Sequence, residues 1–159
     1  MDSFDTRYQV KEAIRNIDVI GSETNTSGAI HLMRHEQFTR RNGDRKSAEN
    51  VAIIITDGES NIDRNATIPE AKKARRDDIT IYSIGITDSI NEDEVKHMSS
   101  QPQKKDKNYF LSTDFESLRT MKIKIECEGM LCVKQALSST LIQNRFYFIN
   151  LISIVYDDF

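Results

Sequence analysis

The chain has 159 residues, 38% of them hydrophobic and only two of them proline, which is enough material for one globular unit with a substantial core. Twenty-two basic and 25 acidic residues give a net charge of −3, and the basic residues are scattered, so the sequence does not indicate a nucleic-acid-binding surface. Two cysteines are too few for a disulfide framework.

Two amphipathic helices are predicted in the first quarter of the chain. Residues 7–17 and 27–38 both carry apolar side chains at the spacing that lines one face of a helix. The polar residues 24–27 stand before the second of these segments and supply oxygens that can cap its amino end. A loop rich in hydroxyl groups is therefore expected to lead into the second helix.

A buried strand follows, and it ends abruptly on a carboxylate. Residues 51–56 are almost entirely apolar and lack alternation with polar residues, which is typical of a central parallel strand covered on both faces. Asp57 then lies at the carboxyl end of this strand, where open α/β sheets place their ligands. Gly58 has no Cβ and is expected to let the backbone turn sharply.

Helices and strands continue to alternate in the second half of the chain. A helix over residues 68–76, with Pro69 in its first turn, and a strand over residues 79–86 complete a right-handed βαβ unit with the preceding strand. Three further elements are predicted: a helix at 91–98, a short strand at 108–111 and a helix at 114–126. The order predicts an α/β fold, a doubly wound and mostly parallel sheet with helices on both faces.

Two polar turns together carry a family resemblance. One is the segment Glu-Thr-Asn-Thr-Ser-Gly-Ala-Ile at residues 23–30, and the other is Ile-Ile-Ile-Thr-Asp-Gly-Glu-Ser at residues 53–60. In this order they resemble the von Willebrand factor type A (vWA) family, which includes integrin inserted domains, matrilins and type VI collagen chains. Supporting matches lie at residues 13–17, 67–71, 81–86, 109–110 and 114–115. The resemblance divides the chain into a partial vWA domain, residues 1–128, and a carboxyl-terminal extension, residues 129–159.

The resemblance implies a metal-ion-dependent adhesion site at the top of the sheet. Thr24 would supply a hydroxyl ligand and Asp57 a carboxylate, directly or through water, with Thr26 and Glu59 at the rim. Such oxygen donors suit Mg²⁺ or Mn²⁺. A plainer interpretation stays open, in which Asp57 only forms an Asp-Gly turn and the two threonines only cap the following helix.

The sequence also departs from the family. The family's principal metal-binding motif, Asp-x-Ser-x-Ser at the end of its first strand, does not occur in the 159 residues. We therefore expect an amino-terminally truncated member of the family that lacks the first strands and binds a cation weakly or not at all. Loss of the first strand would also expose the backbone edge of the strand at residues 51–56.

The carboxyl end offers a replacement for the missing strand. Residues 146–155 are apolar and strand-like, and they are followed by Asp157 and Asp158. One interpretation is a loosely packed tail, which at this length cannot span a bilayer. The other is a strand that occupies the vacant position and brings one of the two aspartates towards Thr24 and Asp57.

The function expected from the resemblance is that of a non-enzymatic adhesion module in an extracellular-matrix protein similar to type VI collagen or matrilin. The implied partner is a protein, collagen or another matrix component, bound through an acidic side chain. We expect no nucleic-acid partner and no membrane span. The implied location is extracellular, although residues 1–7 show no secretion signal.

Two other functions remain open. The chain could be a structural vWA domain whose cation site does not function. A magnesium-dependent α/β phosphotransfer enzyme is less favoured, because the sequence has no glycine-rich phosphate-binding loop and no catalytic residues can be identified.

His31 and His35 share a helix face at i and i+4, and without a third ligand they are interpreted as a surface pair.

Overall fold

The computed structural model describes residues 6–16, 23–114, 116–117 and 149–152, and these residues build a four-stranded sheet. The strands lie side by side in the order β3-β2-β1-β4, and every neighbouring pair is parallel. The strands are β1 (Asn50–Thr56), β2 (Ile79–Ile86), β3 (Tyr109–Ser112) and β4 (Ile149–Ile152). The predicted parallel α/β sheet is confirmed.

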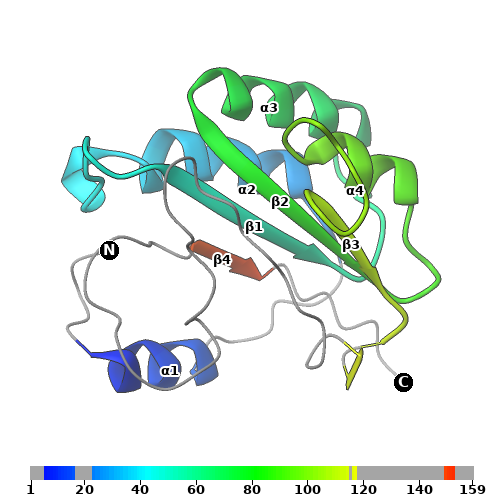
Figure 1. The fold of residues 1–159 in the computed structure, drawn as a ribbon, viewed down its shortest axis with the longest axis horizontal. Helices are drawn as coiled ribbons and strands as arrows, with labels where there is room; N and C mark the ends of the chain where they lie inside the picture. The colour runs from blue at the N-terminus through cyan, green and yellow to red at the C-terminus, as the bar shows by residue number, and fades with distance from the viewer. Residues whose placement is uncertain (1–5, 17–22, 115, 118–148, 153–159) are drawn as a thin grey trace.

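Helices lie on both sides of this sheet, as predicted. Figure 1 shows α2, α3 and α4 on one side and α1 on the opposite side. The helical segments are α1 (Arg7–Arg15), α2 (Thr26–Leu32), the π-helical turn η1 (Met33–Gln37), the 3₁₀ turn η2 (Arg40–Asn42), α3 (Arg64–Arg76) and α4 (Glu92–Met98). Of the helix predicted at 114–126, the structure describes residues 114, 116 and 117, of which 116 and 117 are helical.

The start of α3 differs from the prediction. The helix begins at Arg64 rather than at residue 68, so Pro69 lies inside it and not in its first turn. Asp63, with φ 47°, turns the chain, and its carbonyl accepts a hydrogen bond from the N–H of Ala66 (2.7 Å). Thr67 is fully buried, so its packing stabilises the helical turn that precedes the proline. Pro69 is exposed, and the hydrogen bond that its ring prevents lies on the solvent side.

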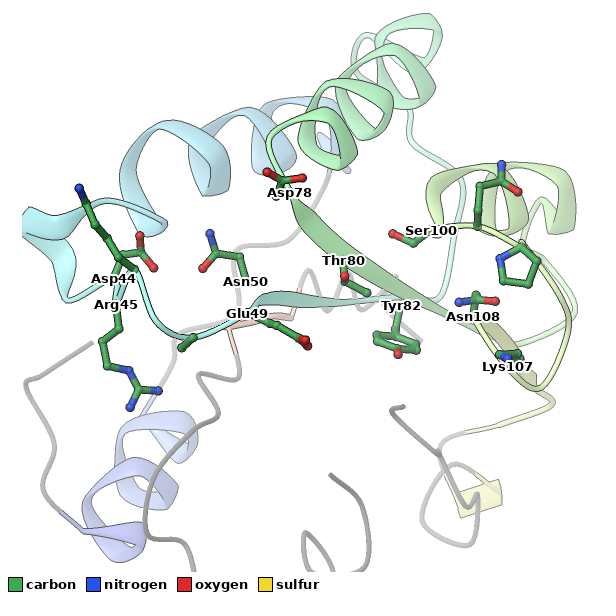
Figure 2. A pocket seen from close by; sticks show the side chains of 14 residues that line it. Asp44, Arg45, Glu49, Asn50, Asp78, Thr80, Tyr82, Ser100, Lys107 and Asn108 are labelled. Carbon is green, nitrogen blue, oxygen red and sulfur yellow. The ribbon is translucent and has the colours of Figure 1, made fainter. Parts of the chain in front are cut away.

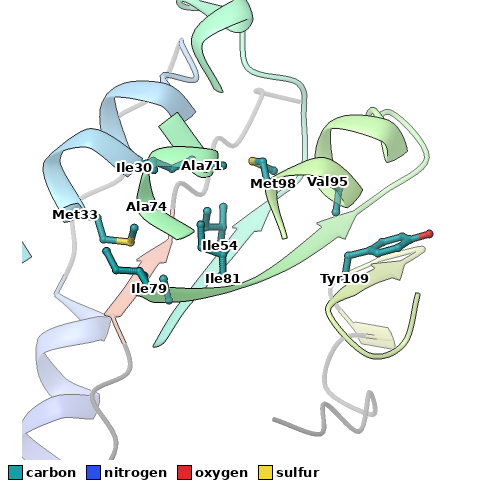
Figure 3. Packing of buried hydrophobic residues seen from close by; sticks show 11 residues of the cluster. Ile30, Met33, Ile54, Ala71, Ala74, Ile79, Ile81, Val95, Met98 and Tyr109 are labelled. Carbon is teal, nitrogen blue, oxygen red and sulfur yellow. The ribbon is translucent and has the colours of Figure 1, made fainter. Parts of the chain in front are cut away.

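The larger apolar core fills the space between the sheet and the three helices α2, α3 and α4. Figure 3 shows the side chains of Ile54 and Ile81 in the two central strands, facing those of the helices. Ala71 and Ala74 of α3 are both fully buried, and their small side chains allow α2 and α3 to approach each other closely. The helices add Ile30, Met33, Val95 and Met98 to this cluster.

A second apolar cluster lies on the other face of the sheet. Its buried members come from all three of the strands β1, β2 and β3, and they are Val51, Ile53, Tyr82, Ile84, Ile86 and Phe110. Because both faces of β1 and β2 are apolar, these strands read as continuous hydrophobic runs in the sequence.

Of the two interpretations of residues 146–155, the strand agrees with the structure, which has β4 at Ile149–Ile152, and the loosely packed tail is wrong for these four residues. It pairs in parallel with β1, from Ala52 opposite Ile149 to Ile55 opposite Ile152, on the side of β1 away from β2. β4 therefore covers part of the backbone edge of β1 that was expected to be exposed. Asp157 and Asp158 lie outside the described residues.

The two glycines at the ends of the central strands have different environments, and the explanation given for Gly58 from the sequence is wrong. Its φ lies outside the left-handed region, and a Cβ there would meet no atom within 4 Å. The turn is instead made by Thr56, whose Oγ1 donates to the Gly58 carbonyl (2.8 Å). At Gly85 a Cβ would lie 2.2 Å from Cδ1 of Ile90 and 3.2 Å from Cγ2 of Val95.

Alanine at these two positions is expected to have unequal effects. Gly85→Ala should lower the free energy of unfolding by about 1–3 kcal/mol, because the new methyl group overpacks the contact with Ile90. Gly58→Ala should change it by less than about 0.5 kcal/mol. Urea denaturation of both variants measures the difference, and equal losses would contradict the packing described here.

Candidate functional site

The candidate site lies where the parallel strands end. Asp57 follows β1 and is half-buried, and Thr87 follows β2. The hydroxyl of Thr87 donates to the carbonyl oxygen of Asp57 (3.0 Å), and its N–H donates to the carbonyl oxygen of Ser112 at the end of β3 (2.9 Å). These two bonds fix the backbone that carries Asp57 against the neighbouring strands.

The loop before α2 meets the loop after β1 at this edge. The N–H of Thr24 donates to Oδ1 of Asn61 (2.7 Å), and the Thr24 carbonyl accepts hydrogen bonds from the N–H groups of Asn61 (3.0 Å) and Ile62 (3.2 Å). Oγ of Ser60 also donates to this carbonyl (3.3 Å). The structure thus brings together the two polar turns recognised in the sequence, and the ligand roles of Thr24 and Asp57 remain predictions.

Helix capping at this edge is performed by Asn25. Its Oδ1 accepts hydrogen bonds from the N–H of Gly28 (2.7 Å) and from Oγ of Ser27 (3.1 Å). Thr24 is 3% exposed and precedes the capping residue, while Thr26 is the first residue of the helix and is also buried. The interpretation of both threonines as the caps of α2 is therefore wrong, because the amide of Asn25 provides this cap.

Two acidic side chains stand at the rim of the site. Glu59 forms an ion pair with Arg64 (2.8 Å). Glu94 was not predicted from the sequence as part of the site, and it is one of three acidic residues in the first turn of α4. Burial raises the pKa of Glu94, and the nearby charge of Glu59 acts in the same direction, while the N–H of Ser60 opposes it. The rim therefore carries two carboxyl groups in addition to that of Asp57.

Glu94 should make stability depend on pH in an unusual direction. Its pKa is higher in the folded chain than in the unfolded chain, so ionised Glu94 disfavours folding above that pKa, and the penalty disappears as the pH falls. Glu94→Gln is therefore expected to raise the melting temperature at pH 7 and to bring no gain at pH 4. Calorimetry at both values tests this. The exposed Glu49→Gln serves as control, and an equal gain at both pH values would contradict the prediction.

Thr24 and Asp57, the two ligands predicted from the sequence, carry donors that suit a hard cation. Thr24 offers a hydroxyl oxygen and Asp57 a carboxylate, and oxygen donors are the preferred ligands of Mg²⁺ and Mn²⁺. Within the described ranges, no group of three or more His, Cys, Asp or Glu side chains is arranged to hold a metal ion. The donor set therefore fits a cation site that is incomplete in protein ligands.

A hollow of about 710 Å³ lies at the opposite edge of the sheet. Figure 2 shows Asn50 at the start of β1 and Thr80 and Tyr82 of β2 around it, with charged side chains of both signs, including Asp44 and Arg45. This is the amino-terminal edge of the strands, whereas ligands of open α/β sheets bind at the carboxyl-terminal edge. The hollow is thus separate from the candidate site.

Comparison with known proteins agrees with this arrangement of the strands and turns. Human matrilin-1 is 29% identical over 132 residues, which cover 83% of this chain and 25% of matrilin-1. Human integrin alpha-11 is 33% identical over 108 residues, which cover 62% of this chain and 9% of the integrin chain. This chain therefore spans only about a quarter of the length of matrilin-1. No described helix is long and apolar enough to cross a membrane.

Solved structures share the fold. Proximal thread matrix protein 1 of the mussel byssus is 21% identical, with a TM-score of 0.68 over 75% of this chain and 30% of the mussel chain. At this identity the likeness shows the fold alone. The model of the von Willebrand factor type A domain matches residues 1–123, well over half of the sequence. The chain belongs to the von Willebrand factor type A domain family.

Proposed function

We propose that the chain is a non-enzymatic protein-binding module of the extracellular matrix that binds Mg²⁺ or Mn²⁺ through Thr24 and Asp57. The observation that carries this proposal is the set of hydrogen bonds between the Thr24 backbone and the loop that follows Asp57. They place a hydroxyl-bearing loop beside a carboxylate-bearing loop at the carboxyl edge of the sheet. A bound cation would supply a positively charged position for a carboxylate of the partner.

The nature of the relatives supports the matrix assignment. Matrilin-1 and the type XII collagen alpha-1 chain of the newt Notophthalmus viridescens both match this chain, the latter at 28% identity over 64% of this chain and 10% of its own length. A second structure of the mussel thread matrix protein is described as having a zinc-occupied metal-ion-dependent adhesion site. We infer for this chain an extracellular location and a matrix partner, collagen or another component with acidic side chains.

The cation site proposed from the described residues has few protein ligands. Thr24 and Asp57 provide two, and water or the partner would provide the others. The second candidate function is a structural vWA domain that does not bind a cation. It is favoured by the ion pair of Glu59 with Arg64, which neutralises one of the two rim carboxylates.

A collagen-binding assay tests the proposal. Immobilised fibrillar collagen should retain the chain in the presence of Mn²⁺ and release it when EDTA is added. Collagen whose carboxyl groups have been converted to amides is the control and should retain less of the chain. Equal retention with Mn²⁺ and with EDTA would contradict a cation-dependent partner, and absence of cation binding in solution would favour the structural alternative.

A further inference from the structure

Two exposed histidines lie against each other on the outer surface of the helical segment formed by α2 and η1. The ring centroids of His31 and His35 are 4.4 Å apart, and the ring planes are tilted by 45°. The side chain of His31 is 60% exposed, and His35 is exposed as well. His35 belongs to the π-helical turn Met33–Gln37, a local distortion that is frequently found at functional sites.

A carboxylate of the neighbouring helix approaches one ring of this pair. Oε2 of Glu70 lies 3.6 Å from Nδ1 of His31. Lys73 (2.6 Å) and Arg34 (3.0 Å) form ion pairs with the Glu70 carboxylate and hold it in place. Histidines that bind metals usually have one ring nitrogen directed at such a carboxylate while the other nitrogen binds the ion. Nε2 of His31 is thus the nitrogen available to a metal.

The charges around the pair are balanced. Arg34 forms ion pairs with Glu70 and with Asp77 (2.6 Å), and Lys73 forms one with Glu70. Two positive charges therefore face two negative charges beneath the histidines. A divalent cation that approaches the rings meets no net positive charge from these groups.

We propose that His31 and His35 bind a transition-metal ion of the Zn²⁺, Ni²⁺ or Cu²⁺ class. Imidazole is a favoured ligand of these ions, and two histidines at i and i+4 on a helix present both rings to one ion. Among the described residues no third His, Cys, Asp or Glu completes the group, so water occupies the remaining positions. The inference is independent of the proposed adhesion function, because it uses nitrogen ligands from another part of the chain.

Titration of the full chain with CuCl₂, NiCl₂, ZnCl₂ and MgCl₂ by isothermal calorimetry tests this site. We expect affinity in the order Cu²⁺, Ni²⁺, Zn²⁺, and no binding of Mg²⁺ by the histidines. His31→Ala and His35→Ala should each weaken Cu²⁺ binding by at least about tenfold. His97→Ala is the matched control, because His97 is an exposed histidine on α4 whose Nδ1 lies 2.7 Å from the Asp93 carbonyl oxygen.

The outcomes separate this site from the one at Asp57. Asp57→Ala should leave Cu²⁺ binding unchanged, and His35→Ala should leave Mg²⁺ and Mn²⁺ binding unchanged. Unchanged Cu²⁺ affinity in both His31→Ala and His35→Ala would overturn the proposal, as would an equal loss in His97→Ala. Circular dichroism of each variant shows that the fold is retained, which is expected because both side chains are exposed.

Discussion

Asp57→Ala is expected to abolish Mn²⁺ binding at the carboxyl edge of the sheet. The variant removes the only charged ligand that we assign to the cation, and a single hydroxyl from Thr24 cannot replace it. Isothermal titration with Mn²⁺ compares the His35→Ala chain with the double variant His35→Ala, Asp57→Ala, so that both proteins lack the histidine pair. The chain that keeps Asp57 should give a weak isotherm and the double variant none.

The fold should survive this substitution. The bond between Thr87 and Asp57 uses the backbone carbonyl of Asp57, which alanine keeps. Glu49→Ala is a suitable control, because Glu49 is an exposed carboxylate at the opposite edge of the sheet. A Mn²⁺ isotherm that is unchanged in Asp57→Ala would show that the ligand assignment is wrong, and no binding by either protein would support the structural alternative.

Ile81→Ala is expected to lower the free energy of unfolding by about 2–5 kcal/mol. Ile81 is 0% exposed and lies in the central strand β2, in the core between the sheet and the helices. Truncation removes three carbon atoms from this core and leaves a cavity that the rigid strand cannot close. Urea denaturation followed by circular dichroism measures the loss.

Leu32→Ala is the matched control for this core substitution. Leu32 is an apolar residue of α2 that is 50% exposed, so its truncation should change the free energy of unfolding by less than about 0.5 kcal/mol. Comparable losses in the two variants would mean that the core is not centred where the structure places it.

Most of the sheet could be predicted from the sequence because its strands are buried on both faces. Such strands appear as uninterrupted apolar runs, and the run at β2 was placed with its observed bounds. The site edge was also predictable, since Asp57 follows directly on a buried strand and parallel strands end at one edge. Periodicity and composition carry this information locally, without knowledge of the tertiary contacts.

Details that depend on contacts between distant residues could not be predicted. The raised pKa of Glu94 results from burial beside the loop after β1, whereas in the sequence Glu94 is one acid among several. The role of Asn61 as a partner of Thr24 depends on a hydrogen bond across 37 positions. Thr87 adopts φ 79°, which is unfavourable for a β-branched residue and is held by its bonds to the neighbouring strand ends.

The position of the carboxyl-terminal strand was one of two interpretations that the sequence left open. Its apolar composition is typical of a strand, but a uniformly apolar strand could pair with either edge of the sheet. The structure places β4 beside β1, in the position that one interpretation gave it. The start of α3 was missed for a related reason, since the burial of Thr67 extends the helix beyond the point at which Pro69 suggested that it begins.

We propose that the loops containing Thr24 and Asp57 form the two sides of one cation site. Paramagnetic line broadening by Mn²⁺ in an NMR spectrum of the His35→Ala chain tests it most directly. We predict that the amide signals of residues 24–25 and 57–59 broaden together, while those of residues 49–50 at the opposite edge remain sharp. Broadening confined to one of the two loops, or equal broadening at both edges, would contradict the claim.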